Sequence, residues 1–460
     1  MKESSLVWLS RSFRYSLEFP VLPHSSLAFL ATMQNQSTTL SISTPHQPQS
    51  VAALLPEEIV DAIFAQLGLD CSLDAKARDR MERYRNLSNI SVVADGWTRP
   101  ARTLLFRSVR IWSWSHLQEE VVEGLGKQVR DLEVNGDHWH AVTSQEAANA
   151  VFRLLKRLPN LRRLHLDSIP CHSFNSTESS SMQPTALLPH LHELEISRIP
   201  FPHSLICDLL ATSGHRIDRL YVHNASRVVP LYAIYRQLDF RGKLRFLSTG
   251  SSFYRTLVDP RLVAVEGLKG LEELQLQGID RRSTEGGEEM YRVIGPTLSV
   301  LSIECDEVSW FADFLPLLSN LSRLSIAGFY SNPDPDPTPL LRCLPPSLSS
   351  LRLATDFHLG PTLARWNAAP SPVPAGLKQI HISDIGNSGT YQQLPPIPTL
   401  RTDYRSATPN LLRQLSPATV PFKTLEMWFH DYYLDQRTVV QAECSRLGVV
   451  FRQRIDHRDD

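Results

Sequence analysis

The chain has 460 residues, 42% of them hydrophobic, which is enough for two or three domains with buried cores. Its 47 basic and 48 acidic side chains nearly cancel, which argues against a nucleic-acid-binding protein, because such proteins usually carry a basic footprint. The six cysteines include no CxxC pair, so we expect reduced thiols in the cytosol or nucleus and no metal or cofactor. No run reaches the roughly 20 apolar residues of a membrane span, so we expect no membrane partner.

Order is expected to begin near Leu54. Residues 1–50 end in a polar stretch rich in serine, threonine and glutamine, which we interpret as part of a disordered leader. Pro56 suits the first turn of a helix, because its φ is fixed and it lacks an amide donor. The apolar residues that follow at helical spacing are Ile59, Ile63, Phe64 and Leu67.

A second helix is predicted over residues 87–97, where an apolar series ends shortly before Pro100. The charged run at 70–86 predicts a loop or an exposed extension between the two helices. Val109 and Ile111 then alternate with polar residues, as a strand entering a sheet would.

The remainder of the chain repeats. A six-residue pattern, apolar-x-x-apolar-x-apolar, occurs twelve times from residue 129 to residue 422, and the eleven intervals cover 293 residues, a mean period of about 27. Leucine-rich repeats have periods of about 20–29 residues. The copies at 244 and 397 carry threonine at the last apolar place.

The repeat predicts one short strand per unit, with one buried face. Runs at helical spacing lie between the strands, at residues 145–158, 203–213, 230–240, 285–294 and 308–318. One strand and one helix cannot bury both apolar faces alone, whereas stacked units can. We therefore predict an α/β protein. Its parts are a small all-helical module at 51–111, an irregular leucine-rich-repeat-like α/β solenoid at 112–455 with a curved parallel sheet inside and helices outside, and a tail at 456–460.

The polar positions of each predicted strand would face away from the core and are candidates for binding a protein substrate. Their charges are mixed, so a purely polyanionic ligand is not indicated, and many of them could equally be solvated strand faces. The candidates are Arg163, His165, Glu193, Glu195, Arg219, Tyr221, Glu273, Gln275, Arg323, Arg352 and His381.

Catalytic and metal-binding patterns are not found. Asp137, His138 and His140 lie close in sequence, but neighbouring strand residues point to opposite faces, so a solvated turn is the favoured interpretation over a metal site. The chain has no Gly-x-Ser-x-Gly elbow, phosphate-binding glycine loop or zinc-protease helix. We expect a protein that is not an enzyme.

Residues 54–111 resemble the F-box, especially its fungal form, through the Leu-Pro-x-Glu-Ile opening, the Val-x-x-x-Trp helix and the Leu-Phe-x-Ser-Val exit. The sequence departs from the family at Ala94, where cysteine is common, and in the long segment 70–86. The resemblance implies contact with a Skp-type adaptor through Leu55, Pro56, Glu57, Ile59, Ile63, Phe64, Leu67, Val93 and Trp97.

Residues 129–429 look like the leucine-rich-repeat region that follows the F-box in one branch of that family. Isoleucines such as Ile169, Ile199 and Ile279 replace the usual asparagine or cysteine, so we expect no asparagine ladder. The resemblance implies a non-catalytic substrate-recognition subunit of a Skp–cullin–F-box ubiquitin ligase, which binds the adaptor, through it a cullin, and an unidentified protein substrate. The alternative is a leucine-rich-repeat interaction scaffold unrelated to ubiquitination, with the first helices as a cap.

Overall fold

The fold is seen in a computed structural model. It describes residues 101, 104, 106–112, 114, 126–139, 142–170, 188–199, 209, 216–223, 243–250, 268–279, 287–305, 309–328, 342–354, 374–382, 397–403, 408–418, 420–429 and 431–455. The predicted leader at 1–50, the tail at 456–460 and most of the module at 51–111 lie outside these residues.

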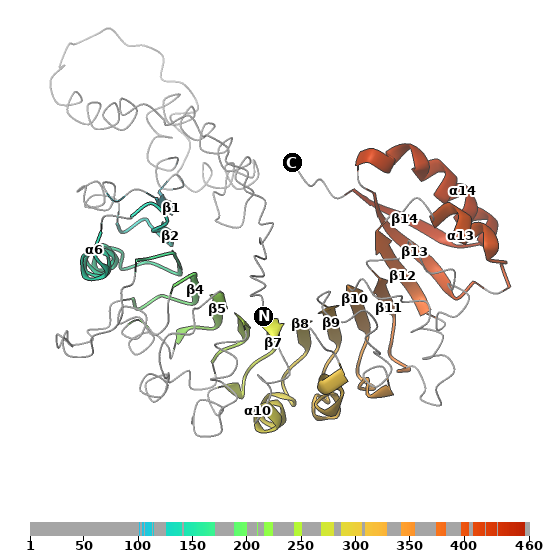
Figure 1. Cartoon of the computed structure of the whole chain (residues 1–460), viewed down its shortest axis with the longest axis horizontal. Coiled ribbons are helices and arrows are strands. Elements are labelled where there is room, and N and C mark those ends of the chain that lie inside the picture. The colour runs from blue at the N-terminus through green and yellow to red at the C-terminus, as the bar shows by residue number, and fades with distance from the viewer. Residues whose placement is uncertain are drawn as a thin grey trace, which may run out of the picture. The chain divides into compact units, whose positions relative to one another are not determined.

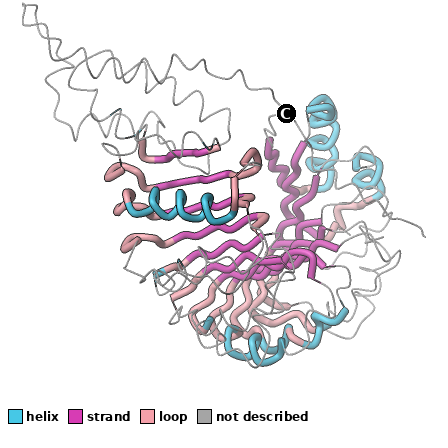
Figure 2. The backbone as a smooth tube through the Cα atoms, turned by 60° about the vertical axis from the view of Figure 1, so that its left-hand side comes forward, coloured by secondary structure: helices cyan, strands magenta, loops and turns pink. Residues whose placement is uncertain are grey.

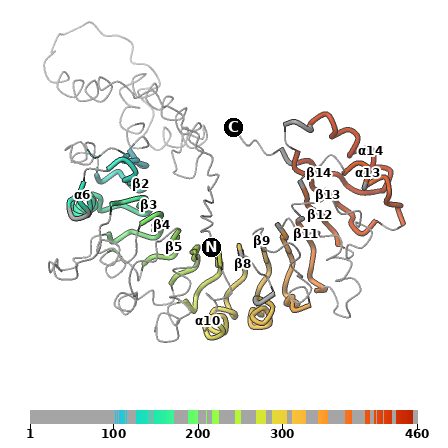
Figure 3. Tube along the Cα trace, in the orientation of Figure 1, coloured from blue at the N-terminus to red at the C-terminus, as the bar shows by residue number. Residues whose placement is uncertain are grey.

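The described strands form one fourteen-stranded parallel sheet, in which every strand pairs with its neighbours in sequence (Figure 1). The order along the sheet is therefore the order along the chain, and the colours of Figure 3 change steadily from strand to strand. The strands are β1 (Ser108–Ile111), β2 (Asp131–Asn135), β3 (Arg163–Asp167), β4 (Glu193–Ser197), β5 (Arg219–His223), β6 (Phe246–Gly250), β7 (Glu273–Ile279), β8 (Val300–Cys305), β9 (Arg323–Gly328), β10 (Ser350–Ala354), β11 (Gln379–Ile382), β12 (Ile397–Asp403), β13 (Phe422–Phe429) and β14 (Val450–Ile455).

Each of the twelve repeat copies contains one of the strands β2–β13, as the pattern predicts. We number the five positions of each strand as in β3, where positions one to five are Arg163, Leu164, His165, Leu166 and Asp167. Strand pairing places residues with the same number beside one another in neighbouring strands. Side chains at the second and fourth positions are buried on one face and form a continuous core from strand to strand. The leucine-rich-repeat-like α/β solenoid is thus present in the described chain.

The two threonine-containing copies keep this arrangement. Thr249 and Thr402 occupy the fourth position of β6 and β12, and both are fully buried. The Thr249 hydroxyl donates to the carbonyl oxygen of Gly250 at 3.1 Å, which satisfies its polar group inside the core.

The isoleucines that replace the asparagine ladder are core residues. Ile169, Ile199 and Ile279 are buried, and each follows a residue with positive φ: Ser168, Arg198 and Gly278, respectively. After β3 and β4 this turn ends the strand, whereas in β7 it coincides with a register shift inside the strand; in all three cases the isoleucine is part of the core. Backbone hydrogen bonds between units continue past the ends of β3 and β4. The Ser168 amide donates to the Ser197 carbonyl and the Arg198 amide to the His223 carbonyl, each at 3.0 Å.

The described helices lie on one side of the sheet (Figure 2). They are α6 (Ser144–Lys156), α10 (Gly287–Ile294), α13 (Thr408–Gln414) and α14 (Arg437–Leu447), with short 3-10 helices η6 (Ser309–Asp313), η7 (Leu315–Leu317) and η9 (Asp431–Gln436). Thr143 begins α6 with a capping box, in which its side chain accepts from the Glu146 amide and the Glu146 carboxylate accepts from Thr143 N–H.

The helix predictions at 145–158 and 285–294 correspond to α6 and α10. The run at 308–318 forms the 3-10 helices η6 and η7 instead of one α-helix, and Pro316 lies in the first turn of η7, where its missing amide prevents continuation of the preceding helix. The runs at 203–213 and 230–240 lie almost wholly outside the described residues.

A repeated backbone contact joins the units where each strand begins. The carbonyl of the residue just before a strand accepts two N–H groups from the next unit; for example, Arg130 O accepts from Arg162 N at 2.6 Å and Arg163 N at 3.0 Å. Equivalent pairs recur from β1 to β11. These bonds fix the residues before neighbouring strands directly beside one another.

Candidate protein-binding face

The face of the sheet opposite the described helices carries the first and third side chains of every strand. We call it the open face; no described helix lies over it (Figures 1 and 2). Register pairing places every predicted substrate residue at one of these two positions, so the structure brings all of them onto this face. They are Arg163, His165, Glu193, Glu195, Arg219, Tyr221, Glu273, Gln275, Arg323, Arg352 and His381.

Charges on β3–β5 pair across the strands. The Glu193 carboxylate lies between two arginines, with its Oε2 3.4 Å from Arg163 Nε and 3.7 Å from Arg219 Nε. Arg219 also stacks over the Phe246 ring, with 4.5 Å from its guanidinium carbon to the ring centroid, and donates to the Tyr221 hydroxyl at 2.9 Å. These candidates therefore support one another as well as facing solvent.

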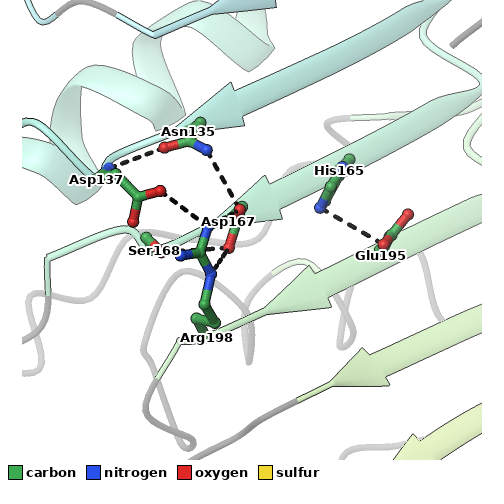
Figure 4. Close-up of polar contacts among 7 residues, drawn as sticks. All are labelled: Asn135, Asp137, His165, Asp167, Ser168, Glu195 and Arg198. Atoms are coloured by element: carbon green, nitrogen blue, oxygen red, sulfur yellow. Dashed lines mark hydrogen bonds and ion pairs between the residues drawn. The ribbon is translucent and has the colours of Figure 1, made fainter. Parts of the chain in front are cut away.

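His165 lies 3.6 Å from Glu195, between Nε2 and Oε1 (Figure 4). Burial, with a smaller contribution from the positive charges of Arg110 and Arg198, lowers the pKa of His165 to about 4 despite the opposing effect of Asp167. The imidazole is consequently neutral at physiological pH, and its contact with Glu195 is not an ion pair there.

A clamp of charged groups joins the strand ends of β2–β4 (Figure 4). Arg198 Nε donates to Asp167 Oδ1 at 2.9 Å, and Arg198 Nη2 contacts both Asp167 and Asp137, the latter at 2.9 Å. Asn135 Nδ2 donates to Asp167 at 3.3 Å. Burial alone raises the pKa of Asp137, but hydrogen bonds from Ser168 and Arg198 outweigh it, so the pKa lies below its usual range. This clamp connects three units.

The segment expected to be a solvated turn is more buried than predicted. Trp139 is 1% exposed, its ring meets Trp114 at 5.2 Å edge to face, and its indole N–H donates to the Trp112 carbonyl at 3.2 Å. Asp137 is held by Arg198, as described above. No group of three or more potential metal ligands is found among the described residues, Asp137 and His138 included.

Small polar side chains occupy the centre of the open face. The third positions of β6–β9 are Ser248, Gln275, Ser302 and Ser325. Beside them, exposed arginines Arg323 and Arg352 form no ion pair with a described residue. This part of the face therefore offers charges that are not already neutralised within the sheet.

A buried carboxylate marks the last strands. Glu426 has a 5% exposed side chain; its Oε2 is 2.7 Å from Arg401 Nε and its Oε1 is 3.5 Å from Arg452 Nη1. His381 stacks on Trp428 with ring centroids 5.1 Å apart and planes 7° from parallel. Burial and the charges of Arg352 and Arg401 lower the pKa of His381 to about 4, which keeps this ring neutral.

Several of these residues were missed from the sequence. Glu133, Arg401 and Glu426 occupy the same third position as the predicted His165, so the repeat alignment could have identified them. Arg198 and Asp137 lie beyond the strands, where the pattern gives no signal.

The residues predicted to contact a Skp-type adaptor lie outside the described part of the chain: Leu55, Pro56, Glu57, Ile59, Ile63, Phe64, Leu67, Val93 and Trp97. Of the F-box-like segment, the final residues form β1, which pairs in parallel with β2. No helix among the described residues is long and apolar enough to cross a membrane.

Comparisons with known proteins give weak likenesses. No protein-family profile and no curated protein matches the chain. Among solved structures, the leucine-rich repeat-containing protein LegL7 from Legionella pneumophila aligns at 14% identity and a TM-score of 0.42, covering 56% of this chain and 89% of LegL7. The yeast Rad7 and Elc1 complex aligns at 13% identity and a TM-score of 0.35, over 89% of this chain and 94% of the matched one.

Proposed function

We propose that this chain is a non-catalytic substrate-recognition subunit of a Skp–cullin–F-box ubiquitin ligase, acting in the cytosol or nucleus. The F-box-like segment would bind a Skp-type adaptor, and the open face would hold a protein substrate. Support for the first part is the sequence pattern at 54–111, and support for the second is the geometry of the sheet.

The observation that carries substrate binding is the alignment of polar side chains on the open face. Parallel register repeats the first and third positions about every 4.8 Å from strand to strand, so charged side chains before β6 and after β8 lie on the same face, with uncharged side chains at these positions of β6 and β8. Arg323 and Arg352 add exposed charge beside small serines. A surface of this kind suits another protein better than a small molecule, which needs an enclosed site.

In this mechanism the chain forms and breaks no bond. It holds the substrate near a ubiquitin-conjugating enzyme and so raises the effective concentration of the reacting lysine, as any tether does.

A second candidate is an interaction scaffold outside any ubiquitin ligase. The pairing of β1 with β2 favours it, because the end of the F-box-like segment is part of the sheet and could serve only to cap the first unit.

Co-purification of a Skp-type adaptor with the full chain separates the two candidates. We expect the adaptor with the wild type and its loss with Leu55→Ala/Pro56→Ala/Ile59→Ala. If adaptor recovery is absent, or unchanged in the triple variant, the ligase proposal fails and the scaffold candidate remains.

The open face is tested separately by quantitative affinity mass spectrometry. The Arg323→Glu/Arg352→Glu variant should lose the proteins that depend on this face and retain the adaptor. Arg437→Glu, an exposed charge reversal at the first residue of α14, is the control and should lose neither.

A further inference from the structure

The last strand of the described sheet has one edge without a neighbouring strand. β14 pairs with β13 alone, so its other edge carries backbone N–H and carbonyl groups to which no described strand bonds. We call this the outer edge of β14. The strand has six residues, a usual length for pairing with another extended chain. β1, which ends the sheet on the other side, has only four residues and is the last part of the F-box-like segment.

The helix α14 holds β14 in place from behind. It ends at Leu447, and Gly448 follows with a φ of 68°, which turns the chain into the strand. The side chains of Val440, Cys444 and Leu447 are buried, and α14 packs against β14. An edge that is already ordered loses little conformational entropy when a partner binds to it.

Apolar side chains of β14 remain partly uncovered. The second position of every strand from β2 to β13 is a buried leucine or isoleucine, whereas the equivalent Phe451 is only half-buried. Phe451 meets the Phe429 ring edge to face, with 6.1 Å between ring centroids. Val450, at the first position on the open face, is 56% exposed. Apolar residues on a further strand would cover both side chains.

Gln453 places a polar group where the core continues. It stands at the fourth position beside the buried Met427, and its side-chain nitrogen is buried without a hydrogen-bond partner in the described part of the chain. A buried N–H without an acceptor is unfavourable. Side chains at equal positions of adjacent strands lie next to each other, and a glutamine or asparagine there could accept from Gln453 through its carbonyl oxygen, as in amide ladders.

Charges at the third position alternate in sign over the last strands. Arg401 of β12, Glu426 of β13 and Arg452 of β14 follow one another, and the first positions of β3–β5 show the same alternation. The Arg452 side chain is 64% exposed and lies 3.5 Å from Glu426, whereas Arg401 lies 2.7 Å from the same carboxylate. An acidic residue on a strand beyond β14 would continue this alternation beside Arg452.

We propose that the outer edge of β14 binds an extended segment of another protein by strand addition, through four successive side chains that are apolar, apolar, acidic and amide-bearing. They would lie beside Val450, Phe451, Arg452 and Gln453, respectively. A second copy of β14 fits poorly, because parallel pairing in register would place Arg452 against Arg452. This interaction goes beyond the proposed function, since it uses neither the F-box-like segment nor the polar candidates of the open face.

The test uses the full chain and fluorescent peptides, with binding measured by anisotropy. One peptide has Val-Leu-Glu-Gln at its centre and the other has Gln-Glu-Leu-Val, which covers parallel and antiparallel pairing; we expect at least one to bind. A strand turns the N–H of every second residue towards its neighbour. N-methylation of one alternate set of peptide amides should therefore weaken binding at least about tenfold, and methylation of the other set should have little effect.

Variants of the chain test the charge. Arg452→Ser should weaken binding of the peptide about threefold to fivefold, and should not weaken binding of a peptide with glutamine in place of glutamate. Arg352→Ser is the matched control, because it removes an exposed third-position arginine from β10, which has a strand on each side. It should bind the peptide like the wild type. Circular dichroism and the thermal midpoint establish that both variants are folded.

The proposal would be overturned if neither peptide binds, if both methylation patterns have the same effect, or if Arg352→Ser loses as much binding as Arg452→Ser. Light scattering tests the other occupant: a dimer that Val450→Lys converts to a monomer would assign the outer edge to a second copy of the chain. Recovery of the Skp-type adaptor with Arg452→Ser should equal that of the wild type, so the ligase proposal and this one can fail independently.

Discussion

The two ends of the sheet contain the same arrangement of charges in different surroundings. Near the beginning, Glu193 lies between Arg163 and Arg219 from the flanking strands. Near the end, Glu426 lies between Arg401 and Arg452. The Glu193 side chain is 18% exposed and lies 3.4 Å from Arg163, whereas the Glu426 side chain is 5% exposed and lies 2.7 Å from Arg401.

Burial decides what each arrangement contributes. Water and salt screen the Glu193 group, so its pairs add little to stability and remain free to exchange for contacts with a partner. Glu426 has lost most of its water, so its charge depends on the two arginines. We therefore propose a binding role for the first arrangement and a structural role for the second.

Removing Arg401 should have the largest effect. Arg401→Met removes the 2.7 Å contact to the buried Glu426 carboxylate and leaves the longer contact to Arg452 in place, and we expect the free energy of unfolding to fall by about 2 kcal/mol. Arg163→Met, the matched change beside Glu193, should cost about 0.5 kcal/mol or less. Urea unfolding of the full chain measures both, and equal losses would contradict the distinction between the two ends.

A smaller effect is expected at the clamp of β2–β4. Arg198→Ala removes the bonds to Asp167 and Asp137, and we expect it to cost about 1 kcal/mol, since the guanidinium is 48% exposed. Arg198 has a φ of 52°, a conformation that costs non-glycine residues about 1 kcal/mol or more. Arg198→Gly should thus be clearly more stable than Arg198→Ala. A thermal midpoint of the glycine variant at or below that of the alanine variant would show that the backbone is not strained.

The two half-buried histidines near the ends of the sheet, His165 and His381, should affect the stability of the fold only at acidic pH. The pKa values of His165 and His381 are lowered to about 4, against 6.5 in the unfolded chain, so the unfolded state binds protons first as the pH falls between these values. Stability is therefore lost on going from pH 6.5 towards 4. His165→Gln and His381→Gln should each flatten this dependence while leaving stability at pH 7 nearly unchanged. The exposed His192→Gln provides the comparison, and an identical slope in all three variants would refute the assignment.

The strands were predictable because alternation and the repeat depend only on neighbouring residues. Leu164 and Leu166 identify β3 without any knowledge of the fold, and the open-face positions follow from the same alternation. The strand β14 has Gln453 where an apolar fourth residue is expected, so the pattern does not extend to it. The clamp of Arg198 requires a positive φ and carboxylates from two other units, which no local pattern encodes.

The strictly sequential strand order has a consequence for how such a chain can change. Since each strand touches only the strands before and after it, Ser350 occupies in β10 the place that Arg323 occupies in β9. Excision of residues 323–349 would join Ser322 to Ser350. Because Ser322 and Ser349 hold equivalent places before their strands, the new bond between residues 322 and 350 would resemble the original bond between residues 349 and 350. One in-frame deletion or duplication can therefore shorten or lengthen the molecule by a whole module, so its reach could evolve without redesign of the remaining contacts.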